Sequence, residues 1–316
     1  MSSGERVRRQ LESAESLGAV VRTMKTLASV RVHQYRRTMR ALDASTLTLD
    51  RAARALLHLH PELADPEPLP PDASAALVVF GSDRGLCGPF NDRMARAAAA
   101  RLDGDAARER TRVVAIGRRV ASRLRTLGIE PAVRLPAPSS LATVEASMAS
   151  LLGVVDAWRA EGAAERLLLV YSRPVGATRF EPRTVQVVPI DPAWLRSLRD
   201  RPWPTRRVPM ELSDPARLAK AVIRQRMALA IVKAFGSSLA AENAARLAAM
   251  EAASRNVEER LARLRAAYHG ARQAAVTAEL LDVQAAAEAL ELGAPARSEG
   301  PPRAATTGRR PRGRRP

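Results

Sequence analysis

The distribution of proline divides this chain of 316 residues into three parts. No proline precedes Pro61, and none lies between Pro215 and Pro295. Proline lacks the backbone donor of a helix and clashes with the preceding turn, so long proline-free spans are candidates for long helices. Both ends of the chain, apart from a short C-terminal tail, are therefore predicted to be helical.

The spacing of apolar residues supports both helices. Over 7–42, mostly apolar residues recur at alternating steps of four and three, which is the 3.5-residue period of a coiled coil. The same period runs through 257–275 and resumes, after a shift of one residue, over 276–290. Neither helix can bury such a seam alone. We therefore expect an N-terminal helix (1–60) and a C-terminal helix (213–293) to pair as an antiparallel coiled coil.

The middle of the chain has the pattern of an α/β domain. Short apolar runs bounded by loop residues predict buried strands, and helical segments alternate with them, which favours a mostly parallel sheet with helices on its faces. The predicted architecture is thus a Rossmann-like domain (72–212), reached through a proline-rich linker (61–71) and inserted between the two terminal helices. The expected strands are 75–80, 112–117 and 166–172, the last forming a hairpin with 183–190, and the expected helices are 91–102, 118–127 and 140–160.

The charge is strongly positive and almost all of it comes from arginine. The formal net charge is +18, and residues 294–316 have the arginine-rich composition of a disordered tail. Such a chain is attracted to nucleic acid, acidic lipid or acidic protein surfaces. A basic coiled-coil protein that binds nucleic acid is therefore one alternative, although aromatic residues that could stack on bases make up only 3% of the chain.

One loop, GSDRGLCGPFN (81–91), looks suited to chemistry, because it combines three glycines with the only cysteine. It does not match the GxxxxGK[ST] or GxGxxG phosphate-binding patterns. An enzyme that uses Cys87 as nucleophile is a second alternative, but 61–268 contains no histidine to act as its base. The four histidines form no metal-ligand pattern either. We therefore expect no catalytic, cofactor or metal site.

Nothing in the sequence predicts insertion into a membrane. The first residues lack the apolar stretch of a secretory signal, and the apolar runs are shorter than the ~18 residues that a membrane span needs. We expect a soluble protein, or one that is attached to a membrane through a partner.

Several motifs, in order along the chain, resemble those of the gamma subunit of F-type ATP synthases. The segment VVRTMKTLASVRV is similar to that family's TKAMKMVAASK, with Met24 and Lys25 matching. The loop is similar to SDRGLCGxxN through Ser82, Asp83, Arg84, Gly85, Leu86, Cys87, Gly88 and Asn91. The C-terminal helix resembles the family's ASExxARMxAMxxAxxNA and ARQAxITxELxEI segments through Glu242, Arg246, Met250, Asn256, Arg272, Gln273, Thr277 and Glu279.

The resemblance implies a rotor subunit without catalysis of its own. Members of that family place one such coiled coil inside the hexamer of alpha and beta subunits, while the α/β domain meets the epsilon subunit and the membrane ring of c subunits. Rotation driven by ion flow then forces the beta subunits through their catalytic states. A peripheral location on the cytoplasmic face of a bacterial inner membrane, one copy per complex and no nucleic-acid partner follow as expectations.

The resemblance also suggests which residues contact the beta subunit. Arg272 and Gln273 match a polar pair that contacts the catch region of beta, and Met24 and Lys25 match the segment facing that region. Met24 also lies on a second apolar stripe with Leu17, Val20 and Leu27, so a place in the coiled-coil core is equally compatible with its position. The departures from the family pattern include His269-Gly270, Ala286-Ala287 and the arginine-rich tail. The coupling ion and the direction of operation are not encoded in this chain.

Overall fold

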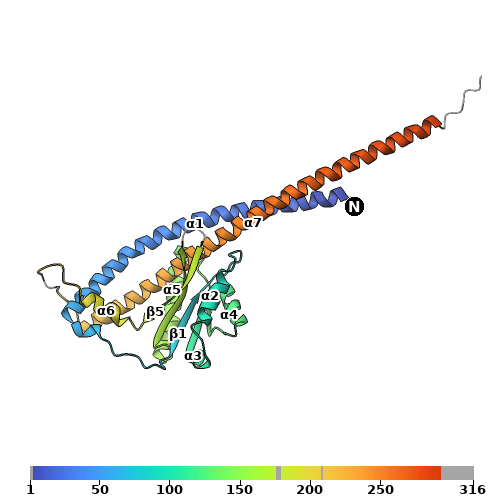
Figure 1. Cartoon of the computed structure of the whole chain (residues 1–316). Helices are drawn as coiled ribbons and strands as arrows, with labels where there is room; N and C mark the ends of the chain where they lie inside the picture. Colours follow the sequence, from blue (N-terminus) through green and yellow to red (C-terminus); the bar gives the residue numbers. More distant parts are fainter. Residues whose placement is uncertain (1–2, 176–178, 208, 293–316) are drawn as a thin grey trace, which may run out of the picture. The chain divides into compact units, whose positions relative to one another are not determined.

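The computed structural model of the chain describes residues 3–175, 179–207 and 209–292. The contacts between residues divide the chain into two units, one of residues 13–260 and one of residues 1–12 with 261–316. Two helices, α1 (Ser3–Leu59) and α7 (Pro215–Leu292), each contribute to both units (Figure 1). The tail expected at 294–316 lies outside the described residues.

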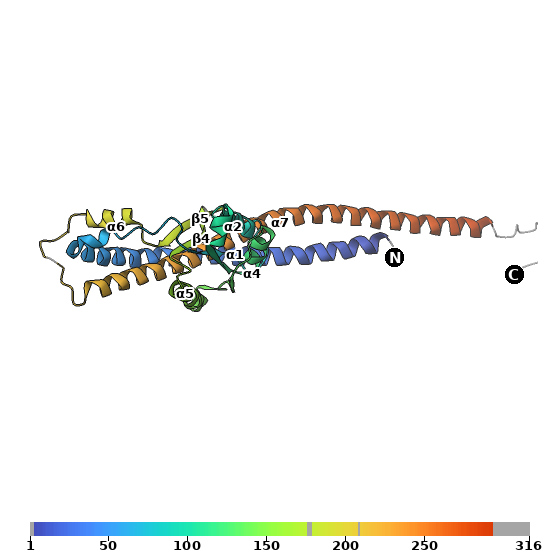
Figure 2. The same ribbon diagram turned by 90° about the horizontal axis from the view of Figure 1, so that it is seen from below.

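Within residues 13–260, α1 and α7 lie side by side and run antiparallel (Figure 2). A Cβ atom added at Gly18 would lie 3.2 Å from Val257, while Lys233 Nζ lies 3.0 Å from a carboxylate oxygen of Asp43. Partners on α7 thus move toward its N-terminus as α1 proceeds toward its C-terminus. This arrangement confirms the antiparallel pair of terminal helices.

The predicted seam is the buried face of α1 in this unit. Lys25 interrupts it and is exposed, since a charged side chain is not buried without a partner. The second stripe behaves differently, because Leu17, Val20 and Leu27 keep more than half of their surface exposed. The buried residues of the seam between 14 and 35 are Ala14, Gly18, Val21, Ala28, Val32 and Tyr35.

α7 begins where a proline and a capping carboxylate favour it. Asp214 Oδ2 accepts a hydrogen bond from the Arg217 amide at 2.9 Å, which satisfies one of the free N–H groups of the first turn. Pro215 occupies the first helical position, where its missing N–H is not needed.

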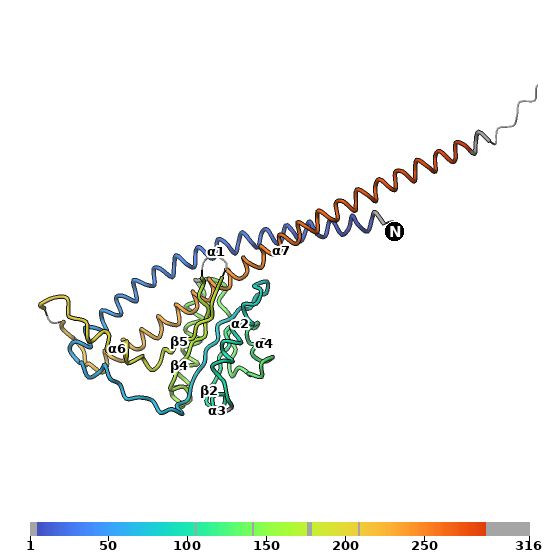
Figure 3. Tube along the Cα trace, viewed as in Figure 1, coloured from blue at the N-terminus to red at the C-terminus, as the bar shows by residue number. Residues whose placement is uncertain are grey.

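The α/β domain follows α1 through a short 3₁₀ helix, η1 (Pro61–Ala64), and an extended connection that Figure 3 traces to the first strand. The strands are β1 (Ala75–Phe80), β2 (Thr111–Ile116), β3 (Val133–Leu135), β4 (Arg166–Val175) and β5 (Arg179–Val188). The helices are α2 (Phe90–Ala99), α3 (Asp105–Glu109), α4 (Arg118–Thr126), a second 3₁₀ helix, η2 (Leu141–Thr143), α5 (Val144–Ala160) and α6 (Pro192–Arg199).

The five strands form one sheet in the order β3-β2-β1-β4-β5. β1 pairs in parallel with β2 and β4, β2 pairs in parallel with β3, and β4 and β5 form an antiparallel hairpin. A mostly parallel sheet between helices confirms the Rossmann-like expectation. Three short elements, β3, α3 and α6, were not predicted, because segments of three to eight residues are too short to show a reliable apolar period.

The two faces of the sheet form separate cores, as the alternation along β1 illustrates. Val78 and Phe80 join a cluster with α5, α1 and α7, whereas Leu77 and Val79 join a cluster with α2 and α4. α7 contributes to both clusters, with Phe235 in the first and Ala241 in the second. The long helix is therefore part of the core of the domain rather than an appendage to it.

Candidate functional site

The loop 82–91 closes on itself through two side chains of the family-like motif. The Asn91 Oδ1 atom accepts a hydrogen bond from the Ser82 amide at 3.0 Å, and Asn91 Nδ2 donates to Ser82 Oγ at 2.9 Å. Ser82 Oγ in turn donates to the Arg84 carbonyl at 2.9 Å. Ser82 is fully buried, so these bonds offset the cost of removing its polar groups from water. The spacing of Ser82 and Asn91 is thus explained by closure of the loop.

Asp83 fastens this loop to two neighbouring segments. Its Oδ1 atom accepts a hydrogen bond from the Arg118 amide, at the first residue of α4, at 2.8 Å. Its Oδ2 atom accepts one from the Ala137 amide, in the segment after β3, at 3.0 Å. A carboxylate is favoured at a helix N-terminus by both the free N–H groups and the helix dipole. Asp83 therefore holds together the segments that follow β1, β2 and β3.

The glycines of this region allow close approach and unusual backbone angles. A Cβ atom at Gly81 would lie 2.3 Å from the Cβ atom of Val120 on α4, so no larger residue fits without a shift. Gly88 has φ +53°, in the left-handed region that glycine adopts readily. The Gly81 amide donates to the Ile116 carbonyl of β2 at 2.8 Å, so it is engaged within the sheet.

Cys87 is a core residue of the α/β domain. Its side chain is 3% exposed and belongs to the cluster with α2 and α4. Burial raises the pKa of the Cys87 thiol, and a hydrogen bond with Ser82 offsets this only in part. A thiol needs a lowered pKa and access to substrate for nucleophilic catalysis. The structure therefore argues against an enzyme based on Cys87.

The second family-like segment, on α7, meets the loop directly. Arg246 Nη2 donates to the Gly85 carbonyl at 3.3 Å and to Glu242 Oε1 at 2.6 Å, and Nη1 donates to Asn243 Oδ1 at 3.3 Å. Arg246 and Glu242 are each 8% exposed. Arg246 and Gly85 are 161 positions apart in the sequence, so one arginine joins two distant motifs. We call this contact the junction.

Burial dominates the electrostatics of the junction. The pKa of Glu242 is raised because its carboxylate loses hydration, although the Arg246 guanidinium opposes this effect. The pKa of Tyr35, on α1, is raised for the same reason, with the nearby Arg31 charge opposing it. Charged groups in such a site require partners, which explains why Glu242 and Arg246 occur four residues apart on one helix.

A cavity of about 240 Å³, which we call the junction cavity, adjoins this contact. It opens beside the loop, the start of α4, the segment after β3, and both long helices. The residues that line it are Arg31, Tyr35, Asp83, Arg84, Arg118, Ala137, Pro138, Ser139, Leu239, Glu242, Asn243 and Arg246.

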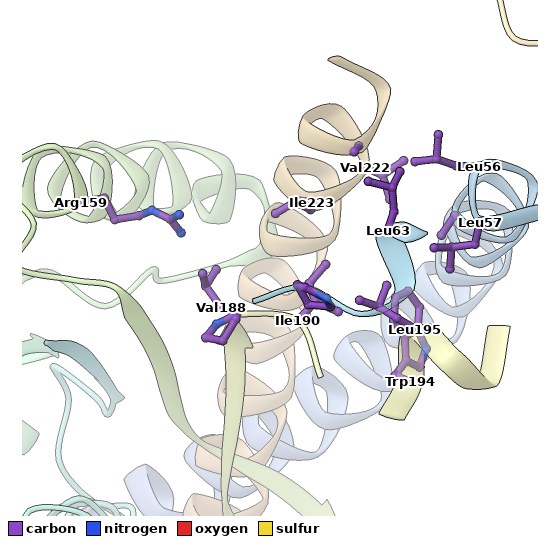
Figure 4. Close-up of a pocket in the computed structure, with 14 residues that line it drawn as sticks. Leu56, Leu57, Leu63, Arg159, Val188, Ile190, Trp194, Leu195, Val222 and Ile223 are labelled. Atoms are coloured by element: carbon purple, nitrogen blue, oxygen red, sulfur yellow. The ribbon is translucent and has the colours of Figure 1, made fainter. Parts of the chain in front are cut away.

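A second cavity, of about 220 Å³, lies where α6 packs against the C-terminal part of α1 and the first turns of α7 (Figure 4). Leu56 and Leu57 of α1, Val222 and Ile223 of α7, and Trp194 of α6 are among its apolar walls. Of the described residues that line it, only Arg159 carries a charge. This lining contains no acid, base or nucleophile with which to perform a reaction.

The residues matched to beta-subunit contacts are accessible for the most part. Met24 is half-buried and Lys25 is exposed in the unit of residues 13–260. Arg272 and Gln273 are exposed in the other unit. Their role in contacting a partner stays a prediction, because the described chain contains no partner.

The remaining motif residues of α7 divide by burial. Met250 is buried, whereas Asn256, Thr277 and Glu279 are exposed, with the Thr277 hydroxyl bonded to the Gln273 carbonyl at 2.9 Å. The predicted seam over 276–290 is not buried in its described part. In the unit of residues 1–12 with 261–316, α1 contributes only residues 3–12, whereas the described part of α7 spans 261–292, so α1 is too short to cover all of α7 there. The exposed apolar side chains there are Val276, Leu280, Leu281 and Val283.

Sequence reasoning did not identify Tyr35, Arg31 and Asn243 as part of the junction. Tyr35 was recognised only as a seam residue. The one signal in the sequence for its place at the junction was that tyrosine is rare, since it occurs three times in the chain. Within the described residues, no group of three histidine, cysteine, aspartate or glutamate side chains could hold a metal ion.

Comparison with known proteins agrees with this architecture. The model of the ATP synthase family matches residues 3–290. The ATP synthase gamma chain of Thiobacillus denitrificans is 26% identical over 92% of this chain and 100% of its own length, and that of Thermosynechococcus vestitus has the same identity and coverage.

Solved structures are similar as well. A chain from a cryo-EM structure of Euglena gracilis mitochondrial ATP synthase (OSCP/F1/c-ring) matches with a TM-score of 0.63 at 18% identity. The match covers 95% of this chain and 98% of that one. A chain from the rotor of the same organism's ATP synthase matches with a TM-score of 0.59 at 17% identity, covering 87% and 99%. The chain therefore belongs to the ATP synthase family that these gamma chains represent.

Proposed function

We propose that this chain is the gamma subunit of an F-type ATP synthase. It is the central-stalk rotor that couples ion-driven rotation of the membrane ring to conformational change in the catalytic beta subunits. The observation that carries the proposal is the pair of long terminal helices around an inserted α/β domain, together with similarity to gamma chains over their full length. A non-catalytic role is in keeping with the burial of Cys87.

The architecture suits the transmission of torque. α7 passes through the core of the α/β domain, where Phe235, Leu239 and Ala241 are buried among sheet residues. A load applied to the domain therefore acts on the helix through close-packed side chains, which deform little. The junction adds a second connection, since Arg246 joins α7 to the loop after β1.

The exposed part of α7 supplies a surface for the catalytic hexamer. Nearly every side chain described between 269 and 288 is exposed, including Leu280 at 65% and Val283 at 65%. Isolated helices have little stability without tertiary packing, and exposed apolar residues in such number favour a partner. Arg272 and Gln273 are the polar contacts to beta that we propose, and Met24 and Lys25 are the contacts on α1.

The remaining partners and the location follow from the same assignment. The α/β domain would meet the epsilon subunit and the c ring, with one copy of the chain per complex. In the described residues, no helix is both long enough and apolar enough to cross a membrane. We propose that the chain is held at the cytoplasmic face of a bacterial inner membrane through the complex.

Rotation provides the sharpest test. The described chain has one cysteine, which is buried, so Arg96→Cys on the exposed side of α2 would introduce a single reactive thiol. We expect the labelled chain to assemble with its cognate alpha and beta subunits, and a bead attached at residue 96 to rotate in one direction when ATP is added.

The cysteine-free reference is Cys87→Ser, which should assemble and allow ATP hydrolysis because the thiol performs no chemistry. Failure of the full-length chain to co-purify with alpha and beta, or an attached bead that does not rotate while the hexamer hydrolyses ATP, would reject the proposal.

A further inference from the structure

The junction cavity has more positive groups than its own carboxylates neutralise. Four arginines line it, Arg31, Arg84, Arg118 and Arg246, against Asp83 and Glu242. Both carboxylates are already engaged, Asp83 by two backbone amides and by Arg118 Nε at 3.6 Å, and Glu242 by Arg246. The cavity therefore has a net positive charge and no free acceptor of comparable strength among its described residues.

Three donors at the cavity have no partner within the described part of the chain. The Tyr35 hydroxyl makes no hydrogen bond there, although Tyr35 is only 3% exposed. The side chains of Arg31, which is half-buried, and Arg84, which is exposed, form neither a hydrogen bond nor an ion pair with described residues. Tyr35 lines the cavity, so its hydroxyl can donate to a ligand or to water there. The raised pKa of Tyr35 keeps its hydroxyl protonated and able to donate.

The cavity also lies where α/β domains bind ligands. Its lining residues follow the carboxyl ends of β1 (Asp83 and Arg84), β2 (Arg118) and β3 (Ala137 to Ser139). In open parallel sheets, ligands bind outside this edge, since loops from several strands converge there. In this chain α7 covers part of that edge, and the cavity is the space that remains.

We propose that the junction cavity binds a small oxyanion, a phosphate group, through Arg31, Tyr35 and Arg84. Guanidinium groups match the geometry of phosphate oxygens and form charge-assisted hydrogen bonds to them. The bound anion would connect α1, which carries Arg31 and Tyr35, to the loop after β1, which carries Arg84. This proposal concerns a ligand of the chain itself and does not depend on the proposed function.

Free inorganic phosphate and the phosphates of a nucleotide share this chemistry, and separate titrations distinguish them. The full-length chain would be titrated by calorimetry with inorganic phosphate and, in a second experiment, with ADP, both at constant ionic strength set by chloride. The arginine-rich tail attracts anions by itself, so every titration is repeated on a chain that lacks residues 297–316.

We expect saturable binding of one phosphate, or one ADP, per chain that survives removal of the tail. Tyr35→Phe preserves the packing of the ring and should weaken binding about two- to tenfold, the value of one neutral hydrogen bond. Arg84→Gln should weaken it about tenfold or more, as expected for loss of a charge-assisted bond. The matched control is Arg40→Gln, which removes an exposed arginine of α1 that does not line the cavity and should leave binding unchanged.

Several results would overturn the proposal. They are no saturable binding to the tail-less chain, equal weakening by Arg84→Gln and Arg40→Gln, or unchanged affinity in both Tyr35→Phe and Arg84→Gln. Binding of a poly-glutamate peptide without binding of phosphate or ADP would also overturn it, since the surface would then take an acidic protein segment.

Discussion

Two regions of α7 carry family-like motifs and yet differ in almost every physical respect. Between 231 and 250 most side chains are buried, and the charged pair Glu242–Arg246 is enclosed at the junction. Between 272 and 288 every described side chain is exposed, leucine and valine included. The comparison teaches that one helix can carry one family-like motif that packs in the core and another that presents a surface. The first region belongs to the packed core, and the second presents its side chains to solvent.

The largest expected difference between the two regions concerns apolar truncation. Phe235 is 2% exposed and its ring meets Phe80 edge to face, with centroids 4.9 Å apart. Phe235→Ala should lower the free energy of unfolding by about 4 kcal/mol, because it removes buried area and leaves a cavity. The matched variant Leu280→Ala should change it by less than about 0.5 kcal/mol. Urea denaturation followed by circular dichroism measures both, and similar effects at the two positions would contradict the comparison.

Removing one member of the junction pair should have the next largest effect. Glu242→Ala leaves the Arg246 guanidinium buried without its carboxylate, and we expect a loss of about 3 kcal/mol in unfolding free energy. Glu279→Ala, at an exposed position of the same helix, is the control.

The double variant Glu242→Ala/Arg246→Ala should be less unstable than the sum of the two single variants, because it leaves no unpaired charge behind. Strict additivity in this double-mutant cycle would show that the two side chains do not stabilise one another.

A smaller effect should appear in the dependence of stability on pH. The pKa of Glu242 is raised by burial in the folded state, so the fold favours its protonated form. Its contribution to stability should therefore decrease as pH rises from the unfolded-state pKa through the folded-state pKa. The unfolding free energy of the chain relative to Glu242→Gln should fall over that range in urea titrations. A difference that is constant from about pH 4 to 8 would show that the folded environment does not perturb Glu242.

The smallest change in stability is expected at the proposed contacts with beta. Arg272→Ala and Gln273→Ala should leave unfolding unchanged, since both side chains are exposed. In the assembled complex each should lower the ATP turnover by about threefold, which corresponds to less than 1 kcal/mol in the barrier. Steady-state hydrolysis by the purified complex measures this effect, and normal turnover in both variants would refute the assignment.

Much of the fold was predictable because it depends on local signals. The proline-free spans and the capping pair Asp214-Pro215 placed α7, whose last described residue is Leu292. Buried strands such as β1 are visible as uninterrupted apolar runs, and the β4–β5 hairpin was anticipated. The short strand β3 was not, because three residues show no period and depend on pairing with β2.

The candidate site was predictable only in part. The loop and the α7 motif were both recognised, but each was recognised separately, since a hydrogen bond between Arg246 and the Gly85 carbonyl leaves no trace in sequence spacing. Tyr35 was assigned to the seam, and its position at the cavity depends on three elements meeting there. The exposure of the second stripe on α1 could not be predicted either. Whether an apolar side chain such as Leu17 is buried depends on whether another segment covers it.

The sequence by itself determined that this chain has two long helices at its ends and an α/β domain between them. Periodicity, proline and capping act over a few residues, so they can be read from the chain directly. Only the tertiary structure decided that α7 runs through the core of the domain, that Glu242 and Arg246 are buried against the loop 82–91, and that Tyr35 faces a positively charged cavity. These features depend on contacts between residues far apart in the chain, and burial, which sets their energetics, exists only once those contacts have formed.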